Sequence, residues 1–337
     1  MKRQRTSLIF EAPYKVSVAE EELPQPQMGQ VLVATSLSAI SPGTEMLVYR
    51  GQLPTEMATD GAIDTTLTEV ATAASQYPVR YGYTCVGKVA AVGEGIDSQW
   101  IGRAVFAFQP HCSHFVADLQ SLLPLPEAMK DEQAIFYPNM ETALTFVLDG
   151  APAIGERVCV VGAGIVGLLT TALLARFPLA ELTVIDPLPA RRQLALHFGA
   201  TAVYSPEEAA QQKATNADLA YEVSGNPEAL NTAIRCTGFA GRVVIGSWYG
   251  QKRAAIDLGG YFHRSRIQLI GSQVSSLPPE RLARWDRQRR TAFTWEMLRQ
   301  VDTHTLITHR FAIHDAALAY DQVDRHAAET GQVLLSY

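Results

Sequence analysis

Short runs of apolar residues, separated by glycine and proline, characterise the first third of the chain. Three of these runs cover residues 31–34, 86–92 and 104–108. Apolar runs of this length between turn-forming residues are typical of β-strands, so residues 6–126 are predicted to form an all-β segment. The stretch 54–78 lacks this pattern and is expected to form a helical or loop insertion.

The pattern changes after residue 156, where apolar runs of strand length alternate with segments of helical length. A continuous apolar run is typical of a parallel strand that is buried on both faces. The alternation therefore predicts an α/β fold class, with a doubly wound parallel sheet of the Rossmann type. The predicted strands cover 157–161, 181–185, 218–223, 241–246 and 267–271, and the predicted helices cover 165–177, 189–198 and 228–236.

A glycine-rich turn joins the first of these strands to its helix. Gly162, Gly164 and Gly167 form the pattern G-x-G-x-x-G, and Asp186 ends the next predicted strand about 20 residues later. The first glycine permits the tight turn, the second lets the backbone approach a pyrophosphate, and the third lets the helix pack on the strand. The turn is therefore predicted to bind a dinucleotide at a helix N-terminus. Its predicted contacts are Gly162, Ala163, Gly164, Ile165, Val166 and Gly167.

The acid at the end of the second strand indicates which coenzyme is bound. The carboxylate of Asp186 can accept hydrogen bonds from the ribose hydroxyls, and its charge repels a 2′-phosphate. NAD is therefore predicted, with NADP as the alternative. Arg191 and Arg192 follow in the next helix, and one of them could contact the adenine or a phosphate, or both could lie on a solvated helix face. Arg191 is included among the coenzyme contacts.

Charge and composition exclude several classes of protein. The formal net charge is −6, so no basic field indicates nucleic-acid binding. No apolar run reaches the roughly 18 residues of a membrane-spanning helix. The cysteines, Cys85, Cys112, Cys159 and Cys236, are widely spaced, so neither a disulfide framework nor a zinc ribbon is expected. A cytoplasmic protein with reduced cysteines is predicted.

Together these motifs resemble the medium-chain dehydrogenase/reductase superfamily, which includes alcohol, sorbitol and threonine dehydrogenases. The resemblance covers nearly the full chain and implies a GroES-like, β-rich catalytic domain beside the Rossmann domain. We therefore expect residues 1–137 and 273–337 in the catalytic domain and residues 138–272 in the Rossmann domain. The resemblance is carried by residues 160–169, 198–201, Gly225 and 241–246.

The zinc ligands of that superfamily have no counterparts at the matching positions. Ser41 stands near the position of the first ligand, a cysteine, and Tyr83 stands where a histidine follows glycine. The third position falls near residues 137–139, where no cysteine occurs. Because zinc binds thiolate, imidazole or carboxylate groups, the resemblance implies a zinc-independent member with no metal site. Residues 41–45, 82–83 and 138–142 are loosely similar to bacteriochlorophyllide-type dehydrogenases, without indicating the pigment as substrate.

Without zinc, a side chain must handle the hydroxyl proton during hydride transfer. Tyr83 is the leading candidate, with a buried core tyrosine as the alternative. Thr44 is similar to the residue that relays this proton in zinc-dependent relatives, and Ser41 is the alternative because the alignment depends on a one-residue insertion. Glu45 is similar to a following acid that supports the site structurally in relatives. Thr44 and Glu45 could instead be ordinary turn formers.

Two further residues are catalytic candidates. His111 precedes a predicted strand that begins at His114, and an imidazole with an unperturbed pKa of about 6.5 suits proton transfer. Metal binding by these two histidines is the less favoured interpretation. Glu141 opens a helix predicted over residues 141–148, where it is either an acid/base group or a charge that is favoured at a helix N-terminus.

Several other residues are predicted to lie near the coenzyme, because ligands bind at the carboxyl ends of strands in such sheets. They are Ser224, Gly246, Ser247 and Ser272. The resemblance adds Thr142, because the corresponding helix of the family lines the nicotinamide side of the site. A run of arginines at 281–290 is interpreted as a solvated basic helix, with a clamp for an anionic substrate as the alternative.

The sequence thus predicts an NAD(H)-dependent oxidoreductase that interconverts a secondary alcohol and a ketone on a medium-sized small molecule. Aromatic residues such as Trp248 and Tyr249 favour a substrate larger than ethanol. The alternatives are an NADPH-dependent quinone- or enoyl-type double-bond reductase and a nucleotide-binding redox sensor without catalysis. The resemblance also implies a homodimer.

Overall fold

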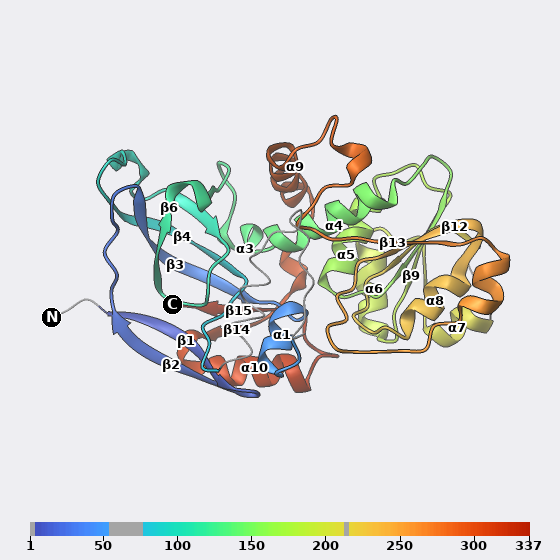
Figure 1. Cartoon of the computed structure of the whole chain (residues 1–337), viewed down its shortest axis with the longest axis horizontal. Coiled ribbons are helices and arrows are strands. Elements are labelled where there is room, and N and C mark those ends of the chain that lie inside the picture. Colours follow the sequence, from blue (N-terminus) through green and yellow to red (C-terminus); the bar gives the residue numbers. More distant parts are fainter. Residues whose placement is uncertain (1–3, 54–76, 212–215) are drawn as a thin grey trace. The chain divides into compact units, whose positions relative to one another are not determined.

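The computed structural model describes residues 4–53, 77–211 and 216–337 (Figure 1). These residues form two compact units, each described by itself below. The first comprises the described residues up to 137 together with 302–337, and the second comprises the described residues of 138–301. The predicted insertion at 54–78 falls almost entirely outside the described residues.

The first unit is built on β-strands, as the apolar runs predict. It contains an antiparallel hairpin, β1 (Gln4–Ala12) with β2 (Lys15–Glu22), and a seven-stranded sheet. The sheet order is β14-β15-β3-β4-β5-β7, with β6 also paired to β3. Its strands are β3 (Gln30–Ile40), β4 (Thr84–Val92), β5 (Ala104–Ala107), β6 (His114–Asp118), β7 (Leu123–Pro124), β14 (Ile307–Ala312) and β15 (Gln332–Ser336).

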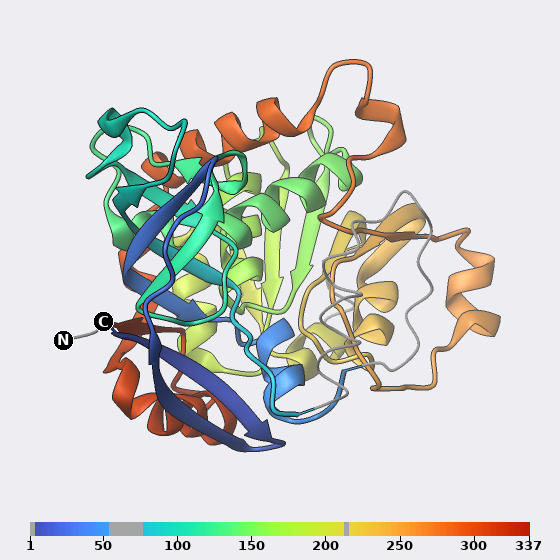
Figure 2. The same cartoon turned by 60° about the vertical axis from the view of Figure 1, so that its left-hand side comes forward.

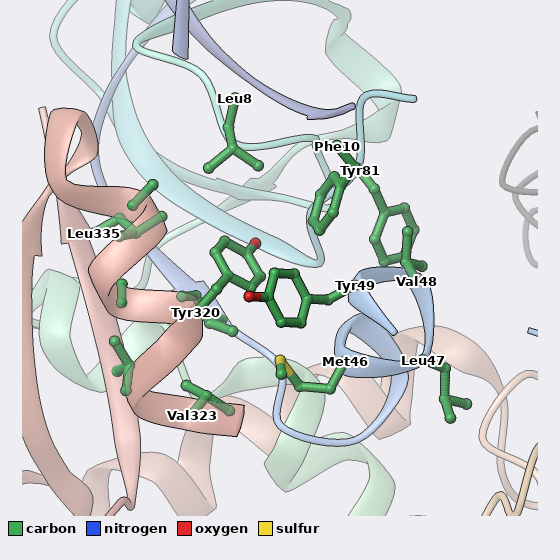
Figure 3. Close-up of a cluster of buried hydrophobic side chains, with 14 of the residues drawn as sticks. Leu8, Phe10, Met46, Leu47, Val48, Tyr49, Tyr81, Tyr320, Val323 and Leu335 are labelled. Carbon is green, nitrogen blue, oxygen red and sulfur yellow. The ribbon is translucent and has the colours of Figure 1, made fainter. Parts of the chain in front are cut away.

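A cluster of buried apolar side chains joins the hairpin to two helices of this unit, α1 (Thr44–Tyr49) and α10 (Ala316–Arg325). A third helix, α3 (Asp131–Ala134), contributes no residue to this cluster. The rings of Tyr49 on α1 and Tyr320 on α10 stack with centroids 5.1 Å apart, and Phe10 of β1 meets Tyr320 edge-on (Figure 3). Segments that are distant in the chain therefore share one core.

The second unit is a parallel sheet of six strands in the order β10-β9-β8-β11-β12-β13. In chain order this is 3-2-1-4-5-6, the arrangement of a doubly wound dinucleotide-binding sheet. Figure 2 shows the sheet from a second direction. Its strands are β8 (Arg157–Val161), β9 (Glu181–Ile185), β10 (Ala202–Tyr204), β11 (Ala217–Glu222), β12 (Thr237–Ile245) and β13 (Gln268–Gly271).

Helices connect these strands, with α5 and α6 on one face of the sheet and α8 on the other (Figure 1). Strand β12 begins four residues before its predicted start, and α4 likewise begins four residues before the helix predicted at 141–148. None of the described helices is both long and apolar enough to cross a membrane. The helices of this unit are α4 (Tyr137–Gly150), α5 (Ile165–Leu174), α6 (Pro189–His197), α7 (Pro206–Gln211), α8 (Ala229–Cys236) and α9 (Arg287–Gln300).

The second boundary between the units differs from the expected one. The division after Tyr137 coincides with the expectation, but residues 273–301 group with the second unit instead of the β-rich unit. Helix α9 is the physical reason. Its buried Arg290 pairs with Glu141 of α4 at 3.0 Å, and the carbonyl oxygen of Gln300 accepts a hydrogen bond from Arg176.

Candidate functional site

The glycine-rich turn joins β8 to α5. Gly162 has a φ of +109°, and a Cβ there would lie 2.7 Å from the backbone of Ser224. A Cβ on Gly167 would lie 2.0 Å from the carbonyl oxygen of Gly162, so the close packing of α5 on the turn requires glycine there. At Gly164, the N-cap of α5, no atom lies within 4 Å of the position a Cβ would take. Two glycines thus serve the fold, and the third leaves bare backbone beside open space.

Asp186 follows β9 and is bound directly to this turn. Its carboxylate is buried, and one oxygen accepts the N–H of Ala163 at 2.7 Å while the other accepts the N–H of Leu188 at 2.9 Å. The guanidinium of Arg192 donates to the carbonyl oxygen of Asp186 at 2.7 Å, and Arg191 lies partly buried beside it on α6. The predicted acid and the predicted turn therefore form one connected structure.

These groups fit a dinucleotide. The turn follows β8 at the point where the strand order reverses between β8 and β11, and doubly wound sheets bind ligands in the crevice at that point. The first N–H groups of α5, which include those of Ile165 and Val166, have no partners within the helix and face an anion favourably. Bare backbone at Gly164 and a carboxylate at Asp186 complete the features expected for binding a pyrophosphate and a ribose.

A second buried acid, Glu222, lies at the end of β11, where no motif in the sequence marks it. Its side chain has no exposed surface. The carboxylate accepts the N–H of Ser224 at 2.9 Å, the hydroxyl of the same serine, and the hydroxyl of Tyr249 at 2.5 Å. The hydroxyl of Ser247 accepts the N–H of Gly225 at 2.8 Å. Of the predicted contacts after the later strands, Ser224 and Ser247 thus lie together.

The other residues predicted to contact the coenzyme form hydrogen bonds with α4 or pack against it. The hydroxyl of Thr142 donates to the carbonyl oxygen of Pro138 at 2.7 Å, within the helix. Ser272 donates to the carboxylate of Asp149, whose pKa is raised by burial. A Cβ at Gly246 would meet the ring of Phe146 at 2.4 Å, so close packing on α4 explains this glycine as well as a coenzyme would.

Glu141 lies in the second turn of α4, so it is not a charge at the helix N-terminus as one of the two interpretations had it. It forms an ion pair with Arg290, whose guanidinium also contacts Thr145 at 3.3 Å and the carbonyl oxygen of Val274 at 2.7 Å. Arg290 is only 5% exposed, so the expectation of a solvated basic helix fails at this residue. The ion pair joins α4 to α9 and does not support an acid/base role for Glu141.

In the first unit, His111 belongs to a buried polar network around Glu45. Both side chains have no exposed surface, and Nε2 of His111 lies 2.8 Å from Oε1 of Glu45. Nδ1 of His111 lies 2.7 Å from the hydroxyl of Ser38. Tyr320 donates its hydroxyl to Glu45, and burial together with this nearby carboxylate raises the pKa of the tyrosine. Because both ring nitrogens have partners inside the core, these contacts do not support His111 as a proton carrier to substrate.

The remaining catalytic candidates lie around this network. The backbone N–H of Ser41 donates to Oε2 of Glu45 at 3.1 Å, so the segment before α1 is held by the buried acid. Thr44, partly buried, is the first residue of α1. Tyr83 is partly buried and packs edge-on against Phe108, with ring centroids 5.7 Å apart. These three residues stay candidates for handling the proton.

The described residues do not fit a zinc ion. Among them, no group of three His, Cys, Asp or Glu side chains is placed to hold a metal. All four cysteines are free and buried. His111 and Glu45 are directed at each other.

Comparisons with known proteins support an oxidoreductase. The family model of zinc-binding dehydrogenases matches residues 166–287, from α5 to the start of α9. This match does not reach Ser41 or Tyr83, where the ligands of a catalytic zinc would be compared. The D-guloside 3-dehydrogenase of Escherichia coli is 24% identical over 227 residues, and the match covers 64% of this chain and 65% of that protein, slightly less than two thirds of its length. The chain is thus similar to the alcohol dehydrogenase-like superfamily.

Solved structures confirm the predicted fold class. A protein described as a zinc-binding dehydrogenase from Sinorhizobium meliloti, solved with NADP, superposes with a TM-score of 0.79 at 17% identity over all of both chains. An Escherichia coli protein described as a short chain alcohol dehydrogenase, solved with NADH, gives a TM-score of 0.77 at 20% identity over 99% of both chains. The matched relative is a dehydrogenase, and both of these structures hold a nicotinamide coenzyme.

Proposed function

We propose that this chain is a zinc-independent, NAD(H)-dependent oxidoreductase that interconverts a secondary alcohol and a ketone on a medium-sized small molecule. The observation that carries the proposal is the open backbone at Gly164, bound through Ala163 to the buried carboxylate of Asp186 at the reversal of strand order. The similarity to the D-guloside 3-dehydrogenase of Escherichia coli supports alcohol chemistry.

The preference for NAD rests on Asp186. Each carboxylate oxygen accepts one backbone N–H and keeps a further lone pair for a ribose hydroxyl. The same oxygens would repel a 2′-phosphate. A bound nicotinamide ring would supply the carbon that gives or takes the hydride.

Zinc independence rests on the donor set of the first unit. Ser41 and Tyr83 occupy the positions compared with zinc ligands, and neither supplies a thiolate, imidazole or carboxylate. The hydroxyl proton then passes to a side chain, with Tyr83 as the first candidate and Ser41 or Thr44 as the alternatives. We also propose a homodimer, for which light scattering in solution at micromolar concentration is the measurement.

Nucleotide titration tests the coenzyme proposal. We expect NADH to quench the tryptophan fluorescence of the protein with a Kd at least about tenfold lower than that of NADPH. Gly164→Val should abolish binding, because its side chain fills the open space, whereas Gly259→Val, at a second glycine with nothing within 4 Å, should bind as the unchanged protein does. Equal or stronger binding of NADPH would favour the double-bond reductase, and binding of neither nucleotide would overturn the proposal.

A substrate panel with metal analysis tests the chemistry. We expect turnover of secondary alcohols after dialysis against a chelator, with less than one zinc per chain. Tyr83→Phe keeps the ring contact with Phe108 and should lower kcat about a hundredfold, in the range of lost acid/base groups. Tyr14→Phe, at an exposed tyrosine, is the control. Tightly held zinc that is needed for turnover contradicts zinc independence, and tight NADH binding without any turnover favours the redox sensor.

A further inference from the structure

Glu222 has no role in the function proposed above, although it lies next to the site. It ends β11, the neighbour of β8 on the side of the sheet opposite to β9 and Asp186. Its side chain is fully buried. Burying a carboxylate is costly unless hydrogen bonds compensate for the lost water, so the donors around Glu222 indicate what it holds in place.

These donors come from two different loops. Ser224, in the loop after β11, donates both its N–H and its hydroxyl to the carboxylate, and Tyr249, in the loop after β12, donates its hydroxyl at 2.5 Å. The carbonyl oxygen of Glu222 accepts the N–H groups of Gly246 at 2.9 Å and Ser247 at 3.2 Å. A single residue therefore ties together the loops that follow two adjacent strands.

Further contacts make this connection continuous. Gly225 donates its N–H to the hydroxyl of Ser247 at 2.8 Å, and Lys252 donates to the carbonyl oxygen of Gly225 at 2.9 Å. Burial and the hydrogen bond to Glu222 raise the pKa of Tyr249, so its hydroxyl keeps the proton that it donates.

The hydrogen-bond partners of Glu222 are compatible with an ionised carboxylate. An ionised carboxylate only accepts hydrogen bonds, and the partners recorded for this one all donate. Among the described residues, no lysine or arginine forms an ion pair with it. The charge therefore acts on whatever lies against these loops.

The position of Glu222 indicates which part of a bound dinucleotide would lie against these two loops. In a doubly wound sheet each half binds one mononucleotide, and the two meet where the strand order reverses. Asp186 marks the half of β8, β9 and β10 as the adenosine side, which leaves β11, β12 and β13 for the nicotinamide. The oxidised nicotinamide ring is positively charged and the reduced ring is neutral, so a buried negative charge attracts the oxidised form.

We propose that Glu222 is the positioning residue of the nicotinamide half-site: it fixes the loops after β11 and β12 through Ser224 and Tyr249, and it favours NAD⁺ over NADH. This inference rests on the proposed binding of NAD(H). The residue acts through the loops and the field of its charge, and no bond is made or broken at it.

The experiment measures the Kd of NAD⁺ and of NADH by calorimetry for the unchanged protein, Glu222→Gln, Tyr249→Phe and Glu228→Gln. Glu222→Gln keeps the shape and removes the charge, so we expect the affinity for NAD⁺ to fall about three- to tenfold more than that for NADH. Tyr249→Phe keeps the charge of Glu222 and removes one hydrogen bond between the loops. The affinities for NAD⁺ and NADH should therefore fall by a similar factor of about three to ten. Glu228→Gln makes the same charge change at an exposed position a short distance further along the chain. It should change neither the Kd of NAD⁺ nor that of NADH.

Each outcome decides between a positioning role and a merely structural one. An unchanged ratio of the two Kd values in folded Glu222→Gln overturns the charge effect, and an unchanged Kd for both nucleotides in Tyr249→Phe overturns the positioning role. If Glu222→Gln does not fold, Tyr249→Phe alone decides, because weakened binding by that folded variant supports the positioning of the loops. Failure of the unchanged protein to bind either nucleotide overturns the proposed function instead.

Discussion

Glu45 and Glu222 are both fully buried glutamates that accept a tyrosine hydroxyl, yet they lie in very different surroundings. The hydrogen-bond partners of Glu222 lie in the loop that follows its own strand, β11, or in the loop after β12. Both loops are at the carboxyl edge of the parallel sheet. The partners of Glu45 are the nearby Ser41 and two residues from distant segments, His111 and Tyr320. One acid therefore organises surface loops, and the other holds the core of the first unit together.

This difference shows that a buried acid does not by itself mark a functional site. A carboxylate whose partners are all in the core does not contact a ligand, so its loss lowers the free energy of unfolding. A carboxylate beneath loops at the end of a parallel strand lies where such sheets bind ligands, so its loss should lower the affinity for a ligand. Four measurements can break or sharpen this distinction.

The largest effect is expected for Glu45→Ala. The change leaves the ring of His111 and the hydroxyl of Tyr320 without their buried partner, so the free energy of unfolding in urea should fall by about 3–5 kcal/mol. Glu132→Ala removes a more exposed partner of Arg310 and should cost less than about 1 kcal/mol. Similar losses in the two variants would mean that the buried network does not stabilise the unit.

Two glycines of the glycine-rich turn, Gly167 and Gly164, should separate stability from the proposed nucleotide binding within the second unit. Gly167→Ala forces a Cβ against the carbonyl oxygen of Gly162, so we expect a loss of about 2–3 kcal/mol in thermal or urea unfolding. Gly164→Ala places its Cβ in open space and should cost less than about 1 kcal/mol. The same variant should weaken NADH binding about tenfold or more. A reversed order of the two stabilities would contradict the geometry of the turn.

The ion pair between α4 and α9 should have an intermediate effect. Glu141→Gln keeps a polar group opposite Arg290 but removes the charge, so the unfolding free energy should fall by about 1–2 kcal/mol. Turnover per folded molecule should stay within about twofold if Glu141 is structural, whereas loss of acid/base catalysis costs about a hundredfold. A loss of kcat at unchanged stability would restore the catalytic interpretation.

The smallest effect concerns the pH dependence of His114. Burial lowers the pKa of its ring below 6.5, so the folded state favours the neutral form. The unfolded chain binds more protons between the lowered pKa and 6.5, and stability should therefore fall as the pH decreases through that window. Because the ring is partly solvated, the loss should stay below about 1 kcal/mol. Urea unfolding at pH 7.5 and 5.5 should show a smaller difference in His114→Gln than in the unchanged protein.

The sequence predicts the second unit well because its signals are local. Apolar runs define the buried strands, and the glycine spacing with Asp186 defines the turn, so the fold class and this part of the site follow from short segments. Glu222 was missed although it ends an apolar strand just as Asp186 does. The motif rule assigns a task to the first of these acids only.

The first unit is harder to predict because its polar contacts are long-range. Nothing near His111 in the sequence indicates that its ring meets Ser38 and Glu45, since those residues lie on other elements. The chain's return to the first unit was placed about 30 residues too early for the same reason. The sequence around Arg290 is typical of a charged surface helix, so it does not indicate the buried ion pair with Glu141.

The order of strands in the first unit has a consequence for synthesis on the ribosome. Strand β15 lies between β14 and β3, and the whole second unit is encoded before either β14 or β15. The sheet of the second unit can therefore form while translation continues. The first part of that edge of β3 pairs with β6, but Leu37–Ile40 stay unpaired on this edge until residues 332–336 emerge. During that interval the exposed edge is the part of the nascent chain most in need of a chaperone.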